Sequence, residues 1–172
     1  MELDMSGDRT QGSVKVLVLD DEEDFLELCR EFFSREDGVQ ADYITSPTKA
    51  LEMLETTGYD VVVSDHTLPG MNGLEFLKAL RSLHTGLPFI LITGRGREGL
   101  ALEALQSGAD FYMEKAGEAR SLFAQLLSTV RTLAVDSARA AECLVEPFQV
   151  FSQSRIYLVS NGGERVMAAS SR

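Results

Sequence analysis

Residues 14–33 read VKVLVLDDEEDFLELCREFF. The first six residues form an apolar run of strand length, and a cluster of acidic residues ends it. Apolar residues then recur at helical spacing, which predicts an amphipathic helix with one buried stripe. The stripe consists of Phe25, Leu28, Cys29, Phe32 and Phe33. A strand that leads directly into such a helix is one β-α unit, so this stretch predicts an α/β fold.

The same alternation repeats to about residue 140. Apolar runs predict strands at 14–19, 39–45, 59–64, 88–93 and 109–113. Between and after them, helical patterns occupy 22–36, 47–57, 73–83, 97–107 and 118–140. These β-α units predict a doubly wound, five-stranded parallel sheet with helices on both faces, a three-layer sandwich. The first, third and fourth strands are rich in apolar residues, as central strands are, whereas the second resembles an edge strand.

Length and composition favour one main domain with additions at its ends. The chain has 172 residues, of which 44% are hydrophobic, enough for one sizeable core. We expect a loose arm at 1–12, the main domain at 13–140 and an extension at 141–172. The extension is too short for an independent DNA-binding domain, so it either packs on the main fold or is a flexible tail. Its β-like runs and the Asn-Gly-Gly turn at 161–163 favour a β-hairpin.

Charge and hydropathy exclude several classes of protein. A net charge of −11 argues against direct nucleic-acid binding, which needs clustered Lys and Arg. The N-terminus has no signal-peptide pattern, and no apolar run approaches the ~20 residues of a membrane span. The distant cysteines, Cys29 and Cys143, suggest neither zinc nor a disulfide framework. We therefore expect a cytoplasmic protein without a membrane partner.

Glycines after the fourth strand match a dinucleotide-binding fingerprint. Gly94, Gly96 and Gly99 have the spacing G-x-G-x-x-G. However, that fingerprint belongs to the first β-α turn of a six-stranded fold, and here it follows the fourth strand. We expect the match to be fortuitous.

Polar residues follow several predicted strands at the point where each strand ends. Asp20 and Asp21 follow the first strand, Asp65 the third and Lys115 the fifth, while Thr93 ends the fourth. In an open parallel sheet, ligands bind beyond these carboxyl ends. Each residue taken alone could be a cap, a turn residue or a solvated charge. These separate interpretations do not explain why all of the residues lie at the carboxyl ends of predicted strands.

Such a cluster of carboxylates needs positive charge. Two carboxylates ~4 Å apart repel by about 4 kcal/mol at an effective dielectric constant near 20. Mg²⁺ prefers oxygen ligands and keeps positions open for phosphate. With Mg²⁺ and Lys115 present, one carboxylate could accept a phosphoryl group as a nucleophile, and Thr93 could donate a hydrogen bond to it.

Four segments resemble the receiver domain of two-component response regulators. They read VLVLDDEEDFLEL, YDVVVSDHTLPGMNGLEFLKALR, PFILITG and GADFYMEK, and the similarity covers about 14–135. The sequences of the last two segments resemble those of receivers from methanogenic archaea. The resemblance implies a flavodoxin-like strand order 2-1-3-4-5 and a signalling phosphoacceptor that catalyses only its own phosphotransfer and autodephosphorylation. It also implies a histidine kinase as phosphodonor and a downstream protein partner. Separately, packing of the C-terminal extension on a neighbouring copy would form a homodimer.

The resemblance implies a role for each matching residue. Asp65 is the phosphoacceptor, and the Mg²⁺ ligands are Asp20, Asp21, Asp65 and the backbone carbonyl of Thr67. Thr93 and Lys115 are the switch hydroxyl and the phosphate-binding lysine. Tyr112 is the aromatic residue whose side-chain rotamer changes with phosphorylation. Thr67 and Arg95 occupy positions that tune the rate of dephosphorylation.

Ala116 and His66 lie next to predicted site residues. The family usually has proline after its lysine, but here the residue is Ala116. A cis bond before a residue other than proline costs about 3 kcal/mol, so we expect a trans Lys115–Ala116 bond. His66 follows Asp65, and we expect it to face solvent.

Three other functions fit these residues less well. A haloacid-dehalogenase-like phosphatase also uses an aspartate and Mg²⁺, but it needs Asp-x-Asp, and Glu22 and Thr67 stand two residues after Asp20 and Asp65. A constitutive interaction module would not need the intact set of site residues. A nucleotide oxidoreductase would need the strands of a second half.

Overall fold

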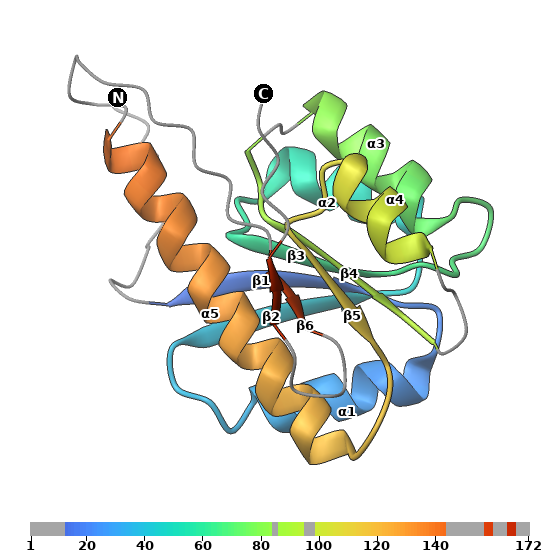
Figure 1. Cartoon of the computed structure of the whole chain (residues 1–172), viewed down its shortest axis with the longest axis vertical. Helices are drawn as coiled ribbons and strands as arrows, with labels where there is room; N and C mark the ends of the chain where they lie inside the picture. Colours follow the sequence, from blue (N-terminus) through green and yellow to red (C-terminus); the bar gives the residue numbers. More distant parts are fainter. Residues whose placement is uncertain (1–12, 84–85, 95–98, 144–156, 160–164, 168–172) are drawn as a thin grey trace, which may run out of the picture.

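The protein folds into three layers (Figure 1), described here from a computed structural model that covers residues 13–83, 86–94, 99–143, 157–159 and 165–167. The strands of the main domain are β1 (Val14–Leu19), β2 (Val39–Ile44), β3 (Val61–Asp65), β4 (Phe89–Thr93) and β5 (Phe111–Glu114). Its helices are α1 (Glu23–Phe33), α2 (Pro47–Thr56), α3 (Gly73–Leu83), α4 (Leu100–Gln106) and α5 (Ala119–Cys143).

The sheet has the predicted order. Strands β2-β1-β3-β4-β5 are neighbours in that sequence and all pair in parallel, which confirms the flavodoxin-like topology. The register pairs Asp65 of β3 with Ile92 of β4, and Thr93 of β4 with Glu114 of β5. Residues at the carboxyl ends of these strands therefore lie along one edge.

Two short strands of the C-terminal extension lengthen this sheet beyond the five predicted strands. β6 (Tyr157–Val159) pairs in parallel with β5, and β7 (Arg165–Met167) pairs antiparallel to β6. The Asn-Gly-Gly turn at 161–163 and the arm at 1–12 lie outside the described residues, and the division into domains stays a prediction.

Two apolar clusters cover the two faces of the sheet. Alternate residues of β1 explain this arrangement: Val16 and Val18 point into the cluster with α1 and α5, whereas Leu17 and Leu19 point into the cluster with α2, α3 and α4. All four side chains are fully buried. The apolar strands are therefore central, as predicted, and the half-buried β2 is an edge strand.

Several boundaries and burial assignments differ from prediction. Leu28 is 39% exposed, and Leu26 takes its place in the core at 1%. Leu26 directly follows the buried Phe25, so the buried face of α1 is centred slightly differently from the predicted stripe. The helix ends at Phe33 rather than 36, while α5 continues past 140 to Cys143. Cys29 is a free, buried thiol, as expected.

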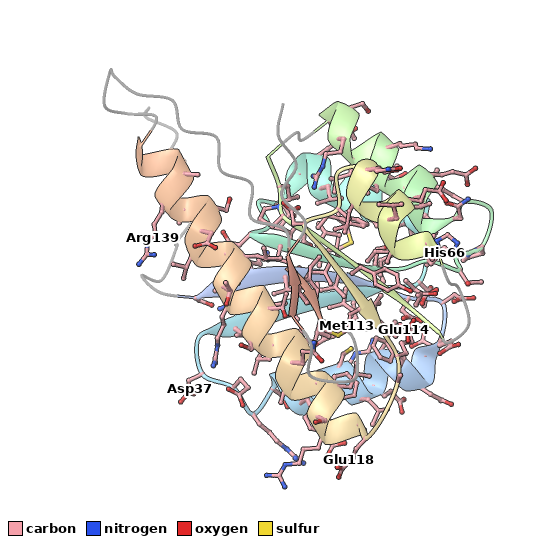
Figure 2. All side chains as sticks on the ribbon, viewed as in Figure 1. Asp37, His66, Met113, Glu114, Glu118 and Arg139 are labelled. Atoms are coloured by element: carbon pink, nitrogen blue, oxygen red, sulfur yellow. The ribbon has the colours of Figure 1, made fainter. Side chains whose placement is uncertain are left out.

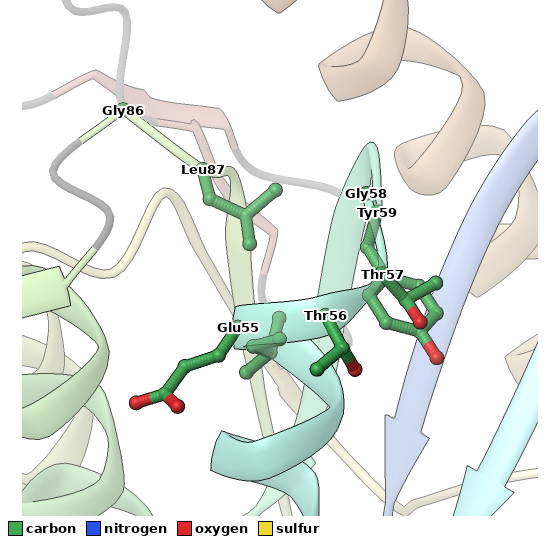
Figure 3. A pocket seen from close by; sticks show the side chains of 8 residues that line it. Glu55, Thr56, Thr57, Gly58, Tyr59, Gly86 and Leu87 are labelled. Atoms are coloured by element: carbon green, nitrogen blue, oxygen red, sulfur yellow. The ribbon is translucent and has the colours of Figure 1, made fainter. Parts of the chain in front are cut away.

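A groove of about 490 Å³ lies at the end of the sheet opposite to the carboxyl ends of the parallel strands (Figure 3). It is formed by the end of α2, by the residues that precede β3, and by Gly86 and Leu87 before β4. Because it lies at the amino ends of β3 and β4, it is separate from the predicted site.

Among the described helices, none combines the length and the apolar character that crossing a membrane requires.

Candidate functional site

The fold brings together three of the predicted site residues in direct contact. Asp20 directly follows β1, Asp65 ends β3, and Lys115 directly follows β5. The Lys115 Nζ lies 2.7 Å from Asp20 Oδ2 and 2.9 Å from Asp65 Oδ1. Thr93, at the end of the neighbouring β4, is 1% exposed. The predicted convergence of polar residues at the strand ends is therefore confirmed for these four residues.

Both acidic side chains in contact with Lys115 are buried. Asp20 is 0% exposed and Asp65 is 3% exposed. Burial raises the pKa of Asp20 to about 6, and Lys115 limits the rise. Burial also opposes the charge of Lys115, but its interactions with Asp20 and Asp65 outweigh this effect and raise the pKa of the ammonium. When both carboxylates are ionised, one ammonium neutralises only one of them.

Backbone hydrogen bonds hold this charged cluster in place. The amide of Glu22 donates to Asp20 Oδ1 at 3.0 Å, and the amide of Thr67 donates to Asp65 Oδ2. The amide of Lys115 donates to the carbonyl of Thr93 at 2.7 Å, which ties the end of β4 to the residue after β5. Lys115 thus reaches both carboxylates although Ala116 follows it. No cis peptide bond occurs in the described residues, so the expected trans bond is confirmed.

The remaining predicted residues lie around this cluster. Asp21 and Thr67 are both exposed. Asp21 directly follows the buried Asp20, and Thr67 lies in the loop after the buried Asp65. Tyr112 is 8% exposed and packs in the apolar cluster that contains Leu100 and Ala104 of α4. Arg95 lies outside the described residues, as does Gly96 of the glycine motif.

The prediction that His66 faces solvent is wrong, because its side chain is only 7% exposed. Figure 2 shows His66 at the same end of the sheet as Glu114. The His66 amide donates to the carbonyl of Ile92 at 3.0 Å, and the amide of Gly73 donates to the His66 carbonyl at 2.8 Å. These two hydrogen bonds hold the backbone of His66 against β4 and the start of α3.

Gly73 is a site residue that sequence reasoning missed. A Cβ at this position would meet the carbonyl oxygen of Asp65 and lie 2.9 Å from the Cα of His66, so only glycine fits. Asn72 caps the start of α3: its Oδ1 accepts from the amides of Leu74 and Glu75. The signal was the Pro-Gly-Met-Asn-Gly segment at 69–73, where the last glycine begins a helix.

The donor groups fit a hard divalent cation in their chemistry. Two buried carboxylates adjoin an exposed third, Asp21, and Mg²⁺ prefers carboxylate and carbonyl oxygens. In the present arrangement Lys115 lies between Asp20 and Asp65. Within the described residues, no group of three or more His, Cys, Asp or Glu side chains is arranged to hold a metal ion. The predicted Mg²⁺ contacts therefore stay a prediction.

Curated relatives of this chain are signalling proteins. It is 30% identical over 151 residues to sensory transduction protein RegX3 of Mycobacterium tuberculosis, which covers 88% of this chain and 66% of the relative. It is 31% identical over 107 residues to response regulator SaeR of Staphylococcus epidermidis, which covers 62% of this chain and 46% of the relative. The chain thus spans less than two thirds of the length of these relatives.

Solved structures with the same fold are receiver domains of response regulators. The receiver domain of Francisella response regulator 1452 matches with a TM-score of 0.63 and 27% identity, covering 73% of this chain and 99% of that one. A CheY-like receiver domain protein from Methanospirillum hungatei matches with a TM-score of 0.62, covering 72% of this chain and 98% of that one; at 22% identity it shows the fold alone. The family model of the response regulator receiver domain matches residues 16–127, and the chain therefore belongs to the response regulator receiver family.

Proposed function

We propose that Asp65 accepts a phosphoryl group from a histidine kinase in a Mg²⁺-dependent reaction, and that this modification changes which proteins bind the domain. The observation that carries the proposal is the contact of Lys115 Nζ with both Asp65 Oδ1 and Asp20 Oδ2. It joins a buried nucleophile, a second buried acid and a cation at the carboxyl ends of neighbouring strands.

In the proposed reaction an oxygen of Asp65 attacks the phosphorus atom. A P–O bond forms as the P–N bond of the phosphohistidine breaks, and the imidazole leaves with a proton from solvent. Asp20, Asp21, Asp65 and the carbonyl of Thr67 would hold Mg²⁺, which supplies positive charge to the phosphoryl oxygens. Lys115 holds one phosphoryl oxygen by a charge-assisted hydrogen bond, and the hydroxyl of Thr93 donates to another.

The response is proposed to pass through Thr93 and Tyr112. Thr93 pairs in register with Glu114 at the end of β5, the strand that also contains Tyr112. We propose that the face formed by α4, β5 and α5 changes its partner preference, and that Thr67 and Arg95 set the lifetime of the phosphoryl group. Beyond its own phosphotransfer and autodephosphorylation, the domain has no proposed enzymatic activity.

We also propose the partners of this domain. The relatives are named as response regulators and sensory transduction proteins, which supports a histidine kinase as donor. A downstream protein and a homodimer complete the proposal. A cytoplasmic location and the lack of direct nucleic-acid binding stay predictions from composition.

Incubation with acetyl phosphate and Mg²⁺ tests the assignment of Asp65. The intact protein is expected to gain the mass of one phosphoryl group, which hydroxylamine removes because the product is an acyl phosphate. Asp65→Asn should abolish the adduct, and EDTA should prevent it. Equal labelling of the Asp65→Asn variant would refute the proposed site.

A further inference from the structure

Phe25 contacts the site, although nothing in the proposed reaction uses it. The Lys115 Nζ lies 4.4 Å from the centroid of the Phe25 ring. A cation within about 6 Å of an aromatic face is attracted by the quadrupole of the ring, more strongly where water is excluded. Water is largely excluded here, because Phe25 is 7% exposed and the side chain of Lys115 is 12% exposed.

The backbone leaves the direction of the Lys115 side chain undetermined. Its amide is fixed on the carbonyl of Thr93, but a lysine stem has four rotatable bonds beyond that point. The residues that follow are Ala116 and Gly117, and Gly117 has a φ of 86°. The position of the ammonium therefore depends on the groups around it, which are Asp20, Asp65, the exposed Glu22 and Phe25.

Phosphorylation of Asp65 leaves the attraction of the Phe25 ring for Lys115 unchanged. Once Asp65 carries a phosphoryl group, its oxygens no longer present the same carboxylate to Lys115. The ring of Phe25 stays where helix packing places it, 5.5 Å from the ring of Phe123 on α5. It lies in the first turn of α1, directly after the acidic residues.

We infer that Phe25 is a positioning residue for Lys115, whose ring holds the ammonium where the phosphoryl oxygens arrive. This role rests on the proposed function of Lys115. The aromatic face is what matters, since an aliphatic residue at the same place would fill the volume but attract no cation.

The variants Phe25→Leu and Phe25→Tyr separate the attraction of the aromatic ring for the cation from the filling of volume by the side chain. Phe25→Leu is expected to slow labelling by acetyl phosphate about threefold to tenfold, the range that corresponds to one partly desolvated cation–π contact. Phe25→Tyr keeps the ring and should restore the rate. Phe32→Leu is the matched control, because Phe32 also stacks on Phe123, at 4.6 Å, but lies about two turns further along α1 than Phe25. It should lower the melting temperature and leave the rate of labelling unchanged.

A double-mutant cycle with Lys115→Ala tests whether Phe25 acts through the lysine. In the Lys115→Ala background, Phe25→Leu should have no further effect on the residual labelling. An equal slowing in both backgrounds would overturn the inference, as would a Phe32→Leu variant that is slowed as much as Phe25→Leu.

Nuclear magnetic resonance tests the contact without phosphorylation. The ε-methylene protons of Lys115 should be shifted upfield by the ring current in the wild type and in Phe25→Tyr, but not in Phe25→Leu. Wild-type protein that takes no label would refute the proposed function and the positioning role with it. Normal labelling together with unshifted Lys115 protons would refute the inference alone.

Discussion

Replacing Lys115 by methionine removes the cation from between two buried carboxylates. Asp20 Oδ2 and Asp65 Oδ1 lie 2.7 Å and 2.9 Å from the same nitrogen, so these two oxygens are at most 5.6 Å apart. Two unit charges at that separation repel by about 3 kcal/mol at an effective dielectric constant near 20. Methionine replaces the apolar stem but leaves this repulsion uncompensated. We expect the free energy of unfolding in EDTA to fall by at most about 3 kcal/mol, because Asp20, whose pKa Lys115 holds down, can take up a proton and relieve the repulsion.

Urea denaturation followed by circular dichroism measures this loss, since the chain has no tryptophan for fluorescence. Mg²⁺ should recover the larger part of it in Lys115→Met, because the divalent ion replaces the missing charge. The double variant Asp20→Asn, Lys115→Met is the control: it removes one of the repelling charges and should regain stability without Mg²⁺. A Lys115→Met protein as stable as the wild type in EDTA would refute this reasoning, as would a double variant no more stable than the single one.

Two further predictions concern the loop after β3 and the C-terminal strands. Gly73→Ala should lower the free energy of unfolding by about 1–3 kcal/mol and slow phosphorylation, because the added Cβ meets backbone atoms of Asp65 and His66. The control, Gly86→Ala, meets no atom within 4 Å and should be nearly neutral by the same urea titration. Deleting 144–172 removes β6 and β7 and uncovers the edge of β5, so either the melting temperature or the mass measured by light scattering should change. An unchanged value of both would show that the extension contributes nothing to the sheet.

The sequence was sufficient to predict the sheet and the convergence of the site residues, because both depend on local patterns. Runs rich in apolar residues marked β1, β3 and β4 as central, and a parallel sheet brings the residues at their carboxyl ends to one edge. The burial of His66 was not predictable in this way. The backbone of His66 is hydrogen-bonded to Ile92 of β4 and to Gly73 of α3, and a local pattern does not indicate such contacts between separate elements.

Contacts between distant residues account for the other differences. Helical spacing correctly marked Phe25 as a core residue, but it could not indicate that the ring also faces Lys115, ninety positions along the chain. Likewise, the β-like runs of the extension predicted strands without a neighbour. The pairing of Tyr112 with Leu158 is a matter of tertiary register. Periodicity describes which face of an element is apolar, and it contains no information on what that face meets.

The connection between the site and the edge of the sheet follows from the backbone. Lys115 donates its amide to Thr93, and Thr93 is in register with Glu114, so β4 and β5 are joined at the carboxyl end where the phosphoryl group is proposed to arrive. Two residues before Glu114, Tyr112 lies in register with Leu158 of β6. A shift of Thr93 or Lys115 toward a phosphoryl oxygen would therefore act on the strand that supports β6. For this reason, the proposed response should be read out at β5, and the deletion of 144–172 should alter it even though no residue of that segment belongs to the site.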